Sequence, residues 1–105
     1  MATTTKALAR AAASLTTTTV LYTVPASTTT VVSNIAVTNT AGSAGTFTLA
    51  MGPSAGQIAL HTTTAIAANT TVYIDLKQVL ATTNTITGGA SAITINFHIS
   101  GVEIS

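Results

Sequence analysis

The sequence contains very little charge. Only 5% of its 105 residues are charged and the formal net charge is +1, whereas about a quarter of the residues in an average soluble protein are charged. So few charges do little to keep copies of a chain apart. We therefore expect partners to cover much of the surface. The three basic residues are too few to neutralise a track of phosphates, which argues against nucleic-acid binding.

Cysteine is absent, which excludes a disulfide framework and a thiolate metal site. Long apolar runs are absent too, because Thr, Ser or Asn interrupts the apolar residues every few positions. A membrane-spanning helix needs roughly 20 such residues in a row, so we expect no membrane partner. The basic, acid-free segment 1–15 fits a transit peptide by composition, and an exposed or docking arm is the other interpretation.

Residues that carry chemistry are scarce. His61, His98, Asp75 and Glu103 are scattered along the chain, whereas a zinc site needs three or four ligands that come together. Serine and threonine are abundant, but no nucleophile elbow and no phosphate-binding loop occurs. We therefore expect no metal, no cofactor and no enzymatic activity, and we expect both histidines to be solvated or to lie in an interface.

What the chain has in abundance is threonine beside valine and isoleucine. From Thr19 on, apolar residues recur at a period of two, the spacing of a β-strand with one buried face. Turn-forming segments at 39–46 and 52–56 separate such stretches. Seven or eight short strands without helices predict an all-β fold, an antiparallel β-sandwich of the jelly-roll or immunoglobulin-like type.

The alternation assigns faces to individual residues. Val72, Ile74 and Leu76 place Tyr73 and Asp75 on the opposite face of their strand, and 93–99 places His98 opposite its isoleucines. His61 likewise falls opposite its apolar neighbours. The parity slips at Gly101, where a bulge or bend is expected to return Val102 and Ile104 to the core.

Domain organisation follows from the same pattern. Residues 19–105 form the predicted sandwich, and residues 1–18 form an N-terminal arm that is extended or contains a short helix within 6–15. A thin core and an uncharged surface favour an obligate homo-oligomer. A flat threonine surface that faces sugars is an alternative, but the threonine clusters are contiguous and aromatic residues are few.

The segments "LYTVPASTTTVVSNIAVTNTAGSAGTFTLAM" (21–51) and "ITINFHISGVEIS" (93–105) resemble small virion proteins of tailed bacteriophages. The resemblance covers about half of the chain, at its two ends. It implies a β-sandwich on the outside of a phage particle, made in the host cytoplasm and commonly trimeric. We expect a capsid decoration (cement) protein that binds the major capsid protein and stabilises the lattice. A tail, collar or fibre component that binds the host surface is the alternative.

The expected partner contacts lie in the arm and on exposed strand faces. The arm is expected to reach onto a neighbouring subunit or another virion protein. The predicted interface residues are Lys6, Leu8, Arg10, Leu15, His61, Tyr73 and His98.

Overall fold

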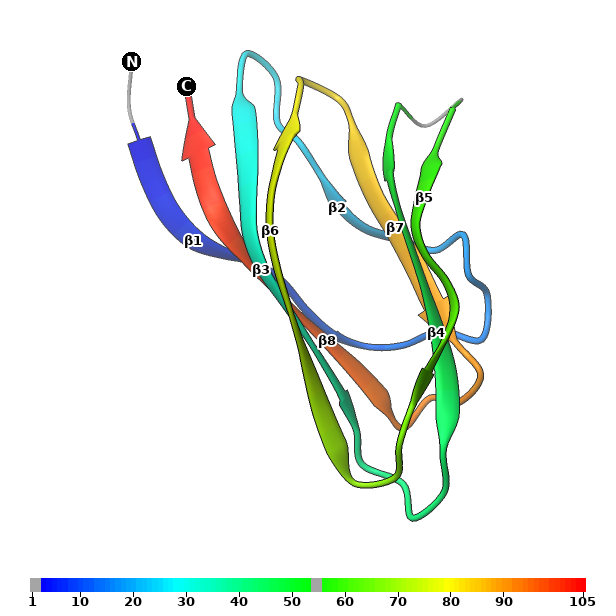
Figure 1. Cartoon of the computed structure of the whole chain (residues 1–105). Coiled ribbons are helices and arrows are strands. Elements are labelled where there is room, and N and C mark those ends of the chain that lie inside the picture. The colour runs from blue at the N-terminus through cyan, green and yellow to red at the C-terminus, as the bar shows by residue number, and fades with distance from the viewer. Residues whose placement is uncertain (1–2, 54–55) are drawn as a thin grey trace.

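The computed structural model describes residues 3–53 and 56–105, which form eight β-strands in two facing four-stranded sheets (Figure 1). Residues 54 and 55 of the turn predicted at 52–56 lie outside the described residues. Among the described residues, no helix has the length and apolar character of a membrane span. The strands are β1 (Thr3–Ala12), β2 (Val20–Thr23), β3 (Thr29–Asn39), β4 (Gly45–Gly52), β5 (Ile58–Ile66), β6 (Thr70–Leu80), β7 (Thr85–Ala90) and β8 (Ile95–Ile104).

The strand order is that of a jelly roll. Sheet A has the order β1-β8-β3-β6 and sheet B the order β2-β7-β4-β5, and all pairings are antiparallel. The pairs β1–β8, β2–β7, β3–β6 and β4–β5 are nested inside one another, so the chain is one long hairpin rolled into two sheets. The predicted antiparallel sandwich is confirmed. Of the two expected types, jelly-roll and immunoglobulin-like, the strand order identifies the jelly roll.

The core lies between the two sheets. Alternate residues of β3, β4 and β8 point inward, as the period of two predicts, and Ile35, Leu49 and Ile99 are fully buried. The rings of Phe47 in sheet B and Phe97 in sheet A meet edge to face, with centroids 6.3 Å apart. This contact joins the two sheets across the core.

The N-terminal segment is extended and takes part in the sandwich. Residues 3–12 form β1, an edge strand of sheet A that pairs with β8 along its length (Figure 1). Of the two conformations that the sequence leaves open, the extended one is present. A short isolated helix is only marginally stable, whereas pairing with the edge of β8 provides hydrogen-bond partners for the backbone. The division of the chain into an arm of residues 1–18 and a domain of residues 19–105 stays a prediction.

The parity slip near Gly101 is resolved differently from the expectation. Strand β8 keeps its alternation, so Gly101 and Glu103 stay on the inward face and Val102 and Ile104 face outward. The extra residues lie in the neighbouring strands, at Leu8 in β1 and Ser33 in β3, where the register shifts. The prediction that a bulge at Gly101 returns Val102 and Ile104 to the core is therefore wrong.

Strand β5 is irregular, which reverses the predicted side of His61. The pairing of β4 with β5 contains two register shifts, and Thr63 in β5 has a positive φ of 47°. As a result His61 pairs with the buried Leu49 and its ring centroid lies 5.4 Å from that of Phe47. His61 is thus half-buried at the rim of the core instead of lying on the outer face of its strand.

Candidate interaction surface

The outer face of sheet A is a continuous four-strand surface. Core residues alternate along β8, so the residues between them point away from the sandwich. The pairing register then assigns one outward residue of each strand to each of four rows. In the strand order β1, β8, β3, β6, the rows are Thr5, Val102, Val31, Val79 (the valine row); Ala7, Ser100, Asn34, Asp75 (the aspartate row); Arg10, His98, Ala36, Tyr73 (the arginine row); and Ala12, Asn96, Thr38, Thr71 (the amide row).

The arginine row has the largest side chains. Arg10 stands at the β1 edge and Tyr73, which is 71% exposed, stands at the β6 edge. Between them lie His98, which is exposed, and Ala36, whose methyl group leaves a shallow place in the face. A cation, a ring, a small residue and a second ring therefore follow one another across the sheet.

The other rows are small, apolar or hydrogen-bonded. In the aspartate row the amide of Asn34 donates to Asp75 Oδ1 at 3.1 Å. In the amide row the hydroxyls of Thr38 and Thr71 are 3.0 Å apart. In the valine row the residues on β8, β3 and β6 are all valines, and Val79 on β6 is 66% exposed.

All five charged side chains of the protein belong to sheet A. They lie on β1, β6 and β8, and none lies in β2, β4, β5 or β7, whose residues are all described. Lys6 and Glu103 pair with each other on the inward side, with Nζ 3.3 Å from Oε1. The remaining three, Arg10, Asp75 and Lys77, lie on the two edge strands of the sheet.

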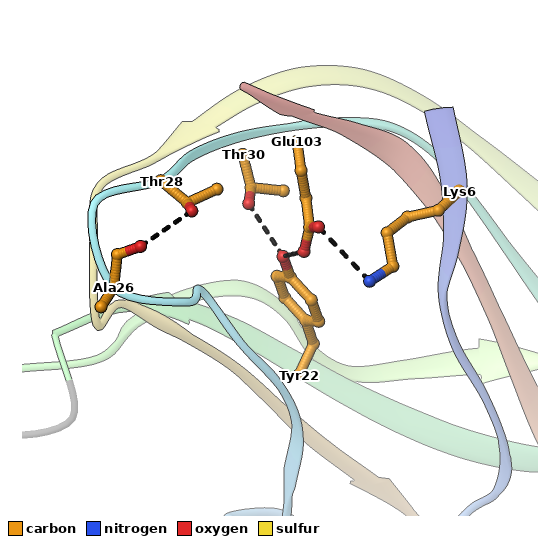
Figure 2. A network of polar contacts seen from close by, with 6 residues as sticks. All are labelled: Lys6, Tyr22, Ala26, Thr28, Thr30 and Glu103. Carbon is orange, nitrogen blue, oxygen red and sulfur yellow. Dashed lines mark hydrogen bonds and ion pairs between the residues drawn. The ribbon is translucent and has the colours of Figure 1, made fainter. Parts of the chain in front are cut away.

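A polar cluster closes the sandwich at the end where Thr3 pairs with Ile104 (Figure 2). The phenol of Tyr22, on sheet B, donates its proton to Glu103 Oε2, and Thr30 Oγ1 lies 2.9 Å from the same phenol oxygen. Lys6 approaches the other oxygen of Glu103 from β1. Because the phenol proton goes to the carboxylate, Thr30 is the donor in its bond to Tyr22.

The cluster shifts the pKa values of its two acids apart. Burial, followed by the hydrogen bond to Glu103, raises the pKa of Tyr22 to about 12. The hydrogen bond from Tyr22, followed by the bond and charge of Lys6, lowers the pKa of Glu103 below its ordinary value. At neutral pH the cluster therefore holds a neutral phenol, a carboxylate and an ammonium group. This arrangement is structural, since each polar group is used inside the cluster.

The outer face of sheet B is neutral and rich in threonine. A depression of about 420 Å³ lies over it, lined by Thr17, Thr48, Thr85 and Thr87 among others. Gln57 crosses this face and is fully engaged, since its amide nitrogen donates to Thr85 Oγ1 at 2.7 Å and its oxygen accepts from Thr87 at 3.1 Å. Within the described part of the chain, no three His, Asp or Glu side chains come close enough to hold a metal ion.

No protein-family model and no curated protein matches this sequence. Among solved structures, the fold is similar to a chain in the structure of infectious bursal disease virus, Gx strain, with a TM-score of 0.54 and 15% identity over 97% of this chain. The likeness shows a shared fold. This chain spans 30% of the length of that viral chain. Two structures of the tobacco streak virus coat protein match 99% of this chain and 83% of theirs, with TM-scores of 0.41 and 0.39 and identities of 14% and 15%.

The structure brings together three of the seven predicted interface residues. Arg10, His98 and Tyr73 lie in the arginine row, although they are far apart in the sequence. Lys6 is held by Glu103, and Leu8 is buried because its bulge turns it toward Gly101.

Leu15 lies apart from the arginine row. It is 66% exposed and belongs to the connection from β1 to β2. His61 lies at the rim of the core, where its Nδ1 is 3.2 Å from Thr64 Oγ1. These two residues therefore belong to other parts of the surface.

Sequence reasoning did not find Ala36 or Val79 as members of this surface. The position of Ala36 beside His98 depends on the strand order, which local patterns do not give. Val79 belongs to the surface because the structure extends β6 to Leu80 as an edge strand.

Proposed function

We propose that this protein is a structural component of a virion, a capsid decoration protein of a tailed bacteriophage that binds the outer lattice and stabilises it. The observation that carries the proposal is an eight-stranded jelly roll whose two outer faces carry, within residues 3–53 and 56–105, only three side chains with unpaired formal charges. Jelly rolls are a common architecture of viral capsid domains. A nearly neutral surface suits a protein that packs in many copies against neighbours, because charge repulsion between copies is small.

Two further observations support a virion role. The fold is similar over 97% of this chain to a chain in the structure of infectious bursal disease virus. The segments 21–51 and 93–105 resemble small virion proteins of tailed bacteriophages. The capsid surface, the major capsid protein as partner and a trimeric state are the finer parts of the proposal, and they come from that resemblance.

The test is the copy number of the protein in purified particles of the virus that encodes it. Quantitative mass spectrometry against the major capsid protein gives the ratio, and low-resolution imaging gives the position. A simple whole-number ratio with density on the lattice is the expected result. A handful of copies confined to the tail would replace the decoration role with a tail, collar or fibre role and move the search to host binding.

A second test uses point substitutions and not a deletion of the N-terminal segment. Deleting residues 2–18 would remove β1, expose the edge of β8 and disturb the fold. Exposed residues on the outer faces of both sheets, changed one face at a time, are better targets. Loss of lattice occupancy by a variant that stays folded would identify the face that meets the capsid.

A further inference from the structure

We propose that the outer face of sheet A docks against the same face of a second copy of this chain, about a two-fold axis that runs along the strands. Such an axis reverses the strand order, so β1 of one copy lies over β6 of the other and β8 lies over β3. A two-fold contact of this kind uses one self-complementary patch on both copies. The inference depends on the fold alone and not on the virion role.

The arginine row is complementary to its own reversal. Turned about the axis, it places His98 of each copy over Ala36 of the other, so a ring enters the shallow place left by a methyl group. It places Arg10 over Tyr73, whose ring is largely exposed in the single chain. A guanidinium group over a tyrosine ring gains a cation–π contact.

The charges are complementary in the same arrangement. Arg10 and Asp75 stand on opposite edge strands, separated by β8 and β3, or roughly 14 Å at the usual strand spacing. The axis brings each Arg10 to the partner strand that carries Asp75, one row away. Lys77 lies on the same strand but further toward the valine row, so Asp75 is the nearer charge to Arg10.

The central strands of two other rows meet groups of their own kind. The valine row places Val102 over Val31, an apolar contact at one end of the face. The amide row places Asn96 over Thr38, so that groups able to donate and accept hydrogen bonds face each other at the other end. At the edge strands small residues meet larger ones, with Thr5 over Val79 and Ala7 over Asp75.

The area is large enough for a specific contact. Four strands spaced about 4.8 Å apart and about ten residues long at about 3.3 Å per residue present a flat area of roughly 600 Å². Two such faces bury on the order of 1,200 Å², the lower limit of stable protein interfaces. A trimer needs two different patches on each copy, so the trimeric state proposed for the virion would use other surfaces of the chain, and the free chain is expected to pair through sheet A.

The experiment is a charge exchange followed by sedimentation of the purified full chain. The wild-type chain is expected to form dimers at micromolar concentration. Arg10→Asp alone places two acids together, and Asp75→Arg alone places two bases together. Each variant should raise the dimer dissociation constant at least tenfold. An equimolar mixture of the two variants should form mixed dimers, because one contact then joins the introduced acid to the introduced base and the other keeps the original Arg10 and Asp75 pair.

Controls separate this contact from others. Ala59→Asp adds a charge to exposed β5 of sheet B and should leave the dimer unchanged. Ala36→Arg fills the place opposite His98 and should abolish the dimer independently of the charge pairs, with circular dichroism confirming the fold. A wild-type chain that stays monomeric at high concentration, an oligomer that both single variants leave intact, or a mixture that does not re-associate would each overturn the proposal.

Discussion

Glu103 on β8 accepts a hydrogen bond from the phenol of Tyr22 on β2, so this side-chain contact joins the two sheets at the end where the terminal strands meet. The Glu103 side chain is only 14% exposed, and Lys6 balances its charge from β1. Three strands are thus held by one carboxylate. The contact makes the stability of the sandwich depend on pH at both ends of the scale.

The acid side of this dependence follows from the lowered pKa of Glu103. A carboxyl whose pKa is lower in the folded chain contributes stability above its ordinary pKa of 4.5, and this contribution is lost as the pH falls through the folded value. Tyr22→Phe removes the largest cause of the shift. The variant should lose about 1–3 kcal/mol of unfolding free energy at neutral pH and show a shallower loss in acid. Urea unfolding of both chains between neutral and acid pH measures this, and superimposable pH profiles would contradict it.

The alkaline side follows from Tyr22, whose pKa rises from 10.0 to about 12. A raised pKa means that the folded chain holds the proton more tightly, so the stability contribution is complete below pH 10 and is lost as the pH rises through about 12. In a Tyr73→Phe background, Tyr22 is the only tyrosine, and phenolate absorbance reports it alone. Ionisation near pH 10 in the folded chain would show that the phenol is not held as described.

Gly101→Ala should destabilise the fold because Gly101 lies against neighbouring strands. A Cβ at this position would overlap the carbonyl oxygen of Val31 and come 3.0 Å from Leu8 Cδ1. Overpacking of this kind costs typically about 1–3 kcal/mol. Gly42→Ala is the matched control, since nothing lies within 4 Å of its added methyl group. Equal urea midpoints for the two variants would refute the close approach.

Leu8→Ala should cost more stability than Leu15→Ala, although both residues belong to the segment expected as an arm. Leu8 is 9% exposed and Leu15 is 66% exposed. Truncating a buried leucine costs about 2–5 kcal/mol, and the edge position of Leu8 places it near the lower figure. Thermal unfolding of the two variants decides the matter. A Leu8→Ala chain as stable as Leu15→Ala would mean that β1 is detached in solution.

Much of the fold follows from the sequence because strand periodicity is a local signal. The alternation placed Tyr73 and Asp75 on an outer face and His98 opposite the isoleucines of its strand, as the structure has them. Hydrophobicity alone failed at the end of β8, where Glu103 takes an inward position that Val102 and Ile104 were expected to fill. A carboxylate is tolerated there only because Tyr22 and Lys6 meet it.

Local sequence patterns could not predict which residues are neighbours on the outer face of sheet A. Arg10, Ala36 and Tyr73 become neighbours only through the order β1-β8-β3-β6 and through its register. That register contains bulges at Leu8 and Ser33, which are fixed by the partner strands and not by the bulged residues themselves. The inward side of His61 likewise depends on the irregular pairing of β5 with β4, which the alternation of residues does not reveal.

The nested pairing of the strands also sets the order in which the chain can fold. The pair β4–β5 closes a short loop, whereas the bond between Lys6 and Glu103 joins residues 97 positions apart. Loop-closure entropy makes such distant contacts slow to form. During synthesis β1 must wait for β8, the last of these eight strands to be made, and the edge of β1 that pairs with β8 stays open until then. A newly made chain is therefore most exposed to mispairing with its neighbours before β8 has been made.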